Sequence, residues 1–205
     1  MSSEILTYLR LGFHHIADVK GYDHILFVAA LTGSYPPSAW RRLLGLVTAF
    51  TLGHSVTLAL ATLGLVHASA AVVEVLIPVT IVVTSLVTVA SLRRPESASW
   101  RRRETEPRWR WELYLLTTCF GLIHGLGFST YLRALLGDEA HIALPLFAFN
   151  VGLEIGQLAI VLATLLLGVL AVRALGVARR DWVLFLCGAT AGVGATMIID
   201  RVTAT

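Results

Sequence analysis

Charged residues and cysteines are both scarce in this sequence. Only 14% of its 205 residues are charged, whereas 56% are hydrophobic, and a soluble domain carries about 25% charged residues. This shortage of polar surface excludes a soluble globular protein. The two cysteines, Cys119 and Cys187, lie in apolar segments outside any CxxC motif, which excludes a disulfide framework. The sequence also shows no basic leader followed by a clean apolar stretch. We therefore expect one transmembrane domain over residues 1–205.

Long apolar segments predict an all-α integral membrane protein, a bundle of about six transmembrane helices. Each segment approaches the ~20 residues with which an α-helix crosses the hydrocarbon layer. The first segment is interrupted by polar residues and by Gly21, so it is either one tilted span or a helix broken, and partly interfacial, near Gly21. The expected spans are about 13–33, 43–65, 71–92, 111–132, 143–171 and 182–201.

Arginines predict the orientation of the bundle. Most of the 16 Lys and Arg residues lie in three predicted loops, 34–42, 93–110 and 173–181, which share one side of a six-span bundle. Basic loops face the cytoplasm, so we expect both termini outside, in a bacterial-type plasma membrane. The same rule explains the basic loop 93–110 without a nucleic-acid partner.

Glycines spaced four residues apart predict close helix contacts. The pairs Gly121–Gly125, Gly152–Gly156 and Gly188–Gly192 are small-xxx-small motifs in the last three predicted spans. Such motifs let helix backbones approach each other in lipid. The sequence leaves open whether the chain also forms a homo-oligomer.

Ionisable side chains occur inside four of the apolar segments. They lie in the motifs GYDHILF (21–27), FTLGHS (50–55), GLIHGLGF (121–128) and FNVGLEIGQ (149–157). With a rise of about 1.5 Å per residue, these groups fall at similar depths, slightly toward the outer side. Such groups are costly in hydrocarbon unless they pair or bind a ligand, so we expect one shared site. Its candidate metal ligands are Asp23, His24, His54, His124 and Glu154.

Polar residues around the first span extend the candidate ligand set. His14 and His15 lie four and three residues before Asp18, so either histidine can share a helix face with it. These residues form an outer binding station or an interfacial polar surface. Asp23 precedes His24, and adjacent residues point about 100° apart on a helix. Asp23 is therefore either a ligand itself or the group that orients a ligating imidazole.

Other polar residues in the spans outline a candidate path for an ion. Asn150, Glu154 and Gln157 lie on one face of the fifth span, which should point to the bundle interior, and Glu74 lies near the outer end of the third. Imidazole nitrogen suits divalent transition metals, and the lack of a thiolate in these motifs disfavours the softest ions. The expected partners are membrane lipid and a divalent transition-metal ion, Ni, Co or Zn.

Five segments carry a resemblance to a known family. They are GFHHI (12–16), GYDHILF (21–27), VTAFTLGHS (47–55), GLIHGLGF (121–128) and FNVGLE (149–154). Together they resemble the HupE/UreJ family of small membrane proteins, which is associated with hydrogenase and urease accessory functions. The resemblance implies a nickel or cobalt permease, in which the histidines of the first span and the inner histidines serve the ion. The interval between the first histidines and the Asp-His pair differs from that of hydrogenase-linked members, which indicates a divergent branch.

Two functions fit these residues. The first is a membrane permease for a divalent transition-metal ion, with a His/carboxylate site open toward the outer face. The second is an intramembrane zinc-dependent hydrolase, in which three histidines hold the metal and Asp23 or Glu154 acts as the base. Transport requires binding that is weak enough for release, whereas a hydrolase holds its zinc tightly.

Overall fold

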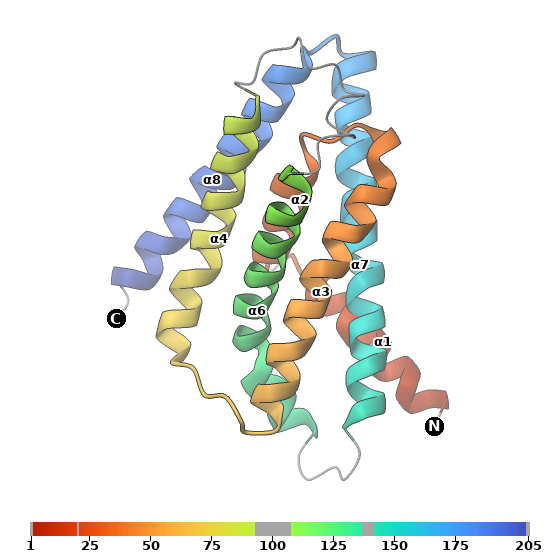
Figure 1. Cartoon of the computed structure of the whole chain (residues 1–205), viewed down its shortest axis with the longest axis vertical. Helices are drawn as coiled ribbons and strands as arrows, with labels where there is room; N and C mark the ends of the chain where they lie inside the picture. Colours follow the sequence, from red (N-terminus) through yellow and green to blue (C-terminus); the bar gives the residue numbers. More distant parts are fainter. Residues whose placement is uncertain (1, 20, 93–107, 137–141, 204–205) are drawn as a thin grey trace.

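The computed structural model describes residues 2–19, 21–92, 108–136 and 142–203. Within these ranges the chain consists of helices and short connections, with no β-strand, as the sequence predicted. The helices are α1 (Ser2–Ala17), α2 (Asp23–Thr32), η1 (Pro37–Ala39), α3 (Trp40–Thr62), α4 (Ala70–Ser91), α6 (Arg108–Leu136), α7 (Ala143–Val169), the π-helical turn η2 (Leu170–Ala174) and α8 (Arg179–Thr203) (Figure 1).

Four helical stretches are long and apolar enough to cross a membrane, and they match four of the expected spans. A six-span bundle is not confirmed, because neither the first nor the fourth expected span meets the same criterion in the described residues. Helix α6 nevertheless covers 111–132 without a break. The four stretches are Pro37–Thr62, Ala70–Ser91, Ala143–Ala174 and Arg179–Thr203.

The first apolar segment is broken into two helices. Helix α1 ends at Ala17 and α2 begins at Asp23, so the break considered near Gly21 is present. With 10 residues, α2 is about 15 Å long, which is roughly half the hydrocarbon thickness. The carboxylate of Asp23 accepts a hydrogen bond from the backbone N–H of His24 at 2.9 Å. That donor has no partner inside the helix, so Asp23 stabilises the start of α2.

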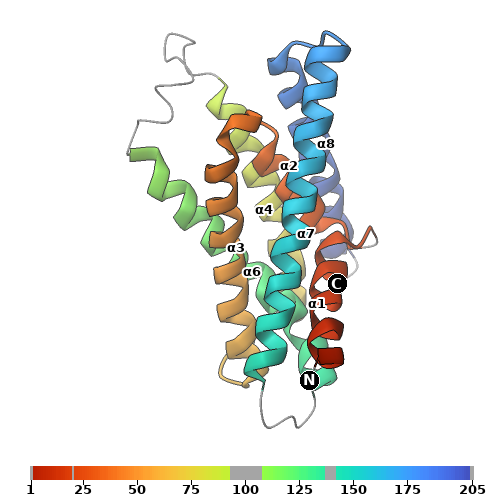
Figure 2. The same cartoon turned by 90° about the vertical axis from the view of Figure 1, so that its right-hand side faces the viewer.

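Three helix pairs surround the short helix α2. Helix α3 packs most extensively on α6, α1 on α7, and α4 on α8, while α2 contacts α4, α7 and α8. Figures 1 and 2 show α2 among these pairs, inside the bundle. Its residues Phe27, Val28 and Leu31 are buried in one hydrophobic cluster with Phe50 of α3 and Phe120 of α6. Burial of this face holds the first turn of α2 at the centre of the bundle.

Glycines allow two of the helix pairs to approach closely. A Cβ atom added at Gly121 would lie 2.1 Å from the carbonyl oxygen of Phe50, and one at Gly152 would lie 1.9 Å from a carbonyl oxygen of α1. These contacts confirm the glycine pairs predicted in α6 and α7. The pair predicted at 188–192 is wrong, because a Cβ at either glycine would meet no described residue within 4 Å. Helix α8 instead meets α4 at Gly194.

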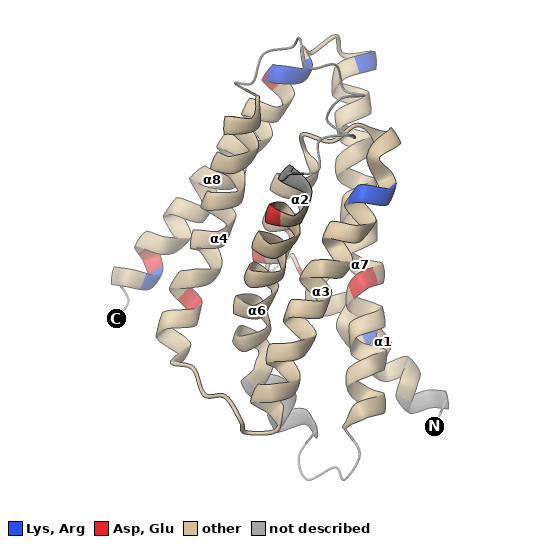
Figure 3. Cartoon of the chain, viewed as in Figure 1, with Lys and Arg blue, Asp and Glu red and all other residues tan. Residues whose placement is uncertain are grey.

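Arginines gather at one end of the bundle, at the start of α3, in η2 and at the start of α8 (Figure 3). We call this the basic end; it lies at the top of Figure 1. The segment 93–107 lies outside the described residues, so the expected cytoplasmic loop 93–110 stays a prediction. The orientation of the termini also stays a prediction.

Candidate metal centre

Four helices each bring one histidine to the centre of the bundle: His15 on α1, His24 on α2, His54 on α3 and His124 on α6. The ring of His24 is the central one. Its centroid lies 4.9 Å from that of His15 and 4.8 Å from that of His124. The centroid of His54 is 6.1 Å away. His24, His54 and His124 are at most 4% exposed. The structure therefore brings these three together, as expected, and adds His15.

Asp23 determines which nitrogen of His24 is protonated. Its Oδ1 atom lies 3.1 Å from Nδ1 of His24, so the carboxylate accepts a hydrogen bond from Nδ1–H. The lone pair is then on Nε2, which is buried with no hydrogen-bond partner among the residues that the structure describes. Carboxylates commonly orient metal-ligating imidazoles in this way. Of the two roles that the sequence left open for Asp23, this geometry favours orientation.

Thr80 on α4 makes the corresponding contact to His124. The Thr80 hydroxyl donates to the carbonyl of Ile77 at 2.7 Å and lies 2.9 Å from Nε2 of His124. Because a hydroxyl has one proton, Thr80 accepts from Nε2–H, and the lone pair of the imidazole is on Nδ1. That atom is also buried without a partner in the described part of the chain. Thr80 was not among the residues predicted from the sequence, since a threonine in an apolar helix carries no signal of its own.

Ring nitrogens of all four histidines have no hydrogen-bond partner among the described residues. They are Nε2 of His15, Nε2 of His24, both nitrogens of His54 and Nδ1 of His124. An unpaired buried polar group costs about 1–3 kcal/mol, and a ligand bound by these nitrogens would offset that cost.

In the part of the chain that the structure describes, two overlapping groups could hold an ion, since the ligand atoms of each group lie within 4.8 Å of one another. A tetrahedral ion with metal–nitrogen bonds of about 2.0–2.1 Å needs ligand atoms about 3.4 Å apart. Either group would therefore need only a small inward movement. The first group is His15, His24 and His54, and the second is Asp23, His24 and His124.

Phenylalanines surround the histidine rings. The centroid of Phe128 lies 3.8 Å from that of His15. Phe27 and Phe50 lie 5.5 and 5.2 Å from the ring of His124. These walls limit access of water to the imidazoles, which strengthens the attraction between the site and a cation.

A comparison with known families assigns the chain to a class. The family described as HupE / UreJ protein matches residues 1–201. The chain belongs to the HupE/UreJ family. Membership suggests a membrane protein related to nickel or cobalt transport, and it gives no support to the zinc-hydrolase alternative. No curated protein and no solved structure matches the chain.

Three candidate residues of this HupE/UreJ protein lie outside the two groups that could hold an ion. His14 is exposed, and its ring meets Phe13 edge-on at a centroid distance of 5.9 Å. Asp18 is exposed just beyond the end of α1. Glu74 is exposed on α4 and forms an ion pair with Arg201 of α8. None of the three belongs to either group that could hold an ion.

The polar face of α7 in this HupE/UreJ protein bonds to α3. Thr48 donates to Oε1 of Glu154 at 2.6 Å, and Thr51 donates to Oε1 of Gln157 at 2.9 Å. This face points into the bundle, as the 3–4 spacing predicted. Glu154 belongs to neither group that could hold an ion. On the same face, Oδ1 of Asn150 and Nε2 of Gln157 are buried without a hydrogen-bond partner among the described residues.

Proposed function

We propose that this HupE/UreJ protein is a permease for a divalent transition-metal ion, with nickel or cobalt favoured as the cargo. The observation that carries the proposal is the set of buried imidazoles around His24, whose unprotonated nitrogens lack partners among the described residues. In hydrocarbon, ionisable groups persist where they pair, bind an ion or do chemistry. The family match supports transport as the class of function.

The chemistry of the donors suits these ions. Neutral imidazole nitrogen is a good ligand for nickel and for the neighbouring borderline divalent metals. Cys119 is exposed and Cys187 lies on α8, so no thiolate among the described residues joins the histidines and selects a softer ion. The carboxylate of Asp23 adds one negative charge beside His24, which favours a divalent cation in a site of low dielectric.

The break between α1 and α2 favours transport over permanent retention of an ion. His15 precedes the break and His24 follows it. A rotation of α1 relative to α2 would separate these two imidazoles and weaken the site. Broken helices form the ion and substrate sites of many membrane transporters. A ligand set that spans a hinge can release its ion, as a permease requires.

We also propose that the basic end faces the cytoplasm. The arginines of α3, η2 and α8 gather there, and the positive-inside rule then orients the chain in a plasma membrane with its termini outside. In that orientation α1 lies on the outer half, so an ion arriving from outside would meet His15 first.

Uptake of Ni²⁺ and Co²⁺ into proteoliposomes tests the proposed function. The wild-type protein should carry at least one of these ions with saturable kinetics, and His24→Ala and His54→Ala should each abolish the flux. His67→Ala is the matched control, because His67 is exposed in the connection between α3 and α4. Folded wild-type protein that carries neither ion would overturn the proposal.

A further inference from the structure

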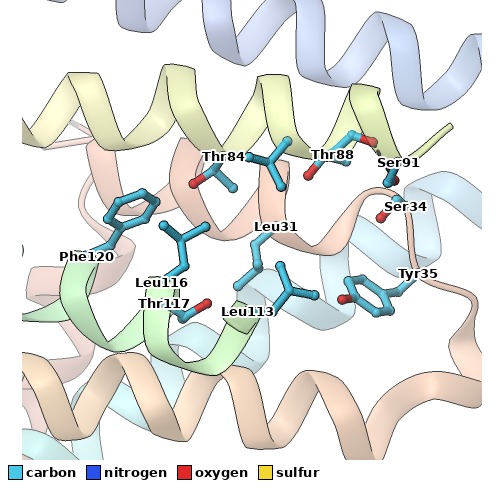
Figure 4. Close-up of a pocket in the computed structure, with 11 residues that line it drawn as sticks. Leu31, Ser34, Tyr35, Thr84, Thr88, Ser91, Leu113, Leu116, Thr117 and Phe120 are labelled. Atoms are coloured by element: carbon cyan, nitrogen blue, oxygen red, sulfur yellow. Dashed lines mark hydrogen bonds between the residues drawn. The ribbon is translucent and has the colours of Figure 1, made fainter. Parts of the chain in front are cut away.

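A small cavity lies between α2, α4 and α6 (Figure 4). Its volume is about 40 Å³, which is room for one or two water molecules at about 30 Å³ each. Among the described residues, no charged side chain lines it. Its polar lining consists of side-chain hydroxyls. They belong to Ser34, Tyr35, Thr84, Thr88, Ser91 and Thr117.

The cavity is stacked on the histidine centre along the same helices. On α6, Thr117 precedes His124 by about two turns, and on α2, Leu31 follows His24 by about two turns. Helix α2 runs toward the basic end and α6 runs away from it (Figures 1 and 2). Thr117 and Leu31 therefore both lie on the basic-end side of the histidine of their own helix. The cavity lies about 10 Å from the histidines, on the side of the basic end.

Two phenylalanines fill the space between the cavity and the histidines. Phe27 lies one turn after His24, and Phe120 lies one turn before His124. Their ring centroids are 5.9 Å apart in an edge-to-face contact. Both residues are buried, and Phe120 also lines the cavity. An apolar constriction of this kind closes an ion route by excluding water.

The hydroxyls of α4 present oxygen lone pairs to the cavity. Thr84 donates to the carbonyl of Thr80 at 2.7 Å. Thr88 donates to a carbonyl of α2 at 3.2 Å, and Ser91 donates to a carbonyl one turn earlier on α4 at 2.6 Å. Because the hydroxyl protons of Thr84 and Thr88 are already used, the remaining lone pairs of these two oxygens accept hydrogen bonds or contact a cation. Uncharged oxygens suit a divalent ion that keeps part of its water shell.

We infer that this cavity is a second station on the ion route, where a partly hydrated divalent cation stays between the histidine centre and the basic end. The Phe27–Phe120 pair is the barrier between the two stations. The inference rests on the proposed function and adds the route by which the ion leaves the histidines. A strong nitrogen site followed by a weak oxygen site lets an ion regain water step by step, because conduction requires sites that the ion can leave.

Filling the cavity tests the inference. Thr84→Leu and Thr117→Leu each place apolar atoms in the cavity, so both should abolish Ni²⁺ and Co²⁺ flux while calorimetric Ni²⁺ binding to the histidine centre stays unchanged. Thr196→Leu is the matched control, because Thr196 is exposed on α8. Thr84→Ser keeps the hydroxyl and should keep the flux.

Thiol reactivity provides a measurement that does not depend on flux. In a Cys119→Ala/Cys187→Ala background, the thiol of Thr117→Cys should react with Ag⁺ added at the basic end, and Ni²⁺ should slow the reaction. Leu115→Cys is the control on the same helix. Leu115 is 53% exposed on the outer surface of the bundle, which faces lipid in the membrane, so this thiol should not react with Ag⁺ in water.

The two proposals fail in different ways. Wild-type protein that carries neither Ni²⁺ nor Co²⁺ overturns the proposed function. Wild-type protein that carries an ion, together with unchanged flux in both leucine variants or an unreactive thiol in Thr117→Cys, overturns the inference about the second station alone.

Discussion

The Oδ1 atom of Asp23 lies 3.1 Å from Nδ1 of His24 and also accepts the backbone N–H of the same histidine. One carboxylate therefore stabilises the start of α2 and sets the tautomer of the central imidazole. Because the two residues are adjacent in the chain, this contact survives any movement of α2 as a rigid helix. The orientation of His24 thus travels with the helix that carries it.

We expect Asp23→Asn to weaken Ni²⁺ binding by about 10–100-fold, the usual effect of losing the group that orients a ligating imidazole. The neutral amide accepts more weakly from Nδ1–H and leaves a less basic Nε2. Isothermal titration of the purified protein measures the change. Asp18→Asn is the control, since Asp18 is an exposed carboxylate before the start of α2. Equal affinities for Asp23→Asn and the wild type would contradict this role.

Thr80→Val should also weaken Ni²⁺ binding, by at least about tenfold. The substitution keeps the shape of the side chain but removes the oxygen that lies 2.9 Å from Nε2 of His124, so the imidazole loses the contact that leaves its lone pair on Nδ1. Thr80→Ser retains the hydroxyl and should restore most of the affinity. If serine and valine at this position behave alike in the titration, the hydroxyl does not act on His124.

The depth of each ionisable residue along its helix was the feature that the sequence predicted best. A fixed rise per residue places His24, His54 and His124 at one level, and the structure brings these three rings together. Direction around the helix axis was harder to predict. Glu154 has a similar depth, but its carboxylate accepts from Thr48 and lies outside both groups that could hold an ion.

Contacts that depend on helix neighbours could not be predicted from one sequence. The role of Thr80 arises because α4 packs beside α6, and the ring of Phe128 on α6 meets that of His15 on α1. The glycine pair 188–192 is the opposite case, a sequence motif without the contact that it predicts. Its spacing matches a packing motif, but its face of α8 has no neighbour within reach in the described residues.

Bound metal should stabilise the folded protein. At a free Ni²⁺ concentration of 100 times the dissociation constant, a ligand that binds only the folded state adds about 2.7 kcal/mol. Thermal unfolding in detergent should therefore shift upward with Ni²⁺ and return on chelation. His54→Ala should lose the shift, since both nitrogens of His54 lack partners among the described residues. The control variant His67→Ala should keep it. An equal shift in His54→Ala would place the bound ion elsewhere.

Gly121→Ala should destabilise the bundle by about 1–3 kcal/mol, the usual cost of overpacking, because the new Cβ would lie 2.1 Å from the carbonyl oxygen of Phe50. Gly192→Ala is the matched control on α8, where the added methyl meets nothing within 4 Å. Alanine also favours a helix over glycine by up to about 1 kcal/mol, so this control should unfold at the same temperature or higher. Equal destabilisation of the two variants would mean that α3 and α6 do not pack through Gly121.

Glu154→Gln should leave Ni²⁺ affinity unchanged, although Glu154 is one of the few carboxylates in the spans. Its Oε1 atom is engaged by the hydroxyl of Thr48, and the amide oxygen of glutamine can accept the same hydrogen bond. Ni²⁺ titration of Glu154→Gln should be compared with that of Asp23→Asn, because each variant removes one carboxylate charge. The comparison separates the local role of Asp23 beside His24 from a general effect of charge. If Glu154→Gln weakens binding as much as Asp23→Asn does, α7 must rotate to bring Glu154 to the ion, and a fifth helix then joins the four that carry the histidines.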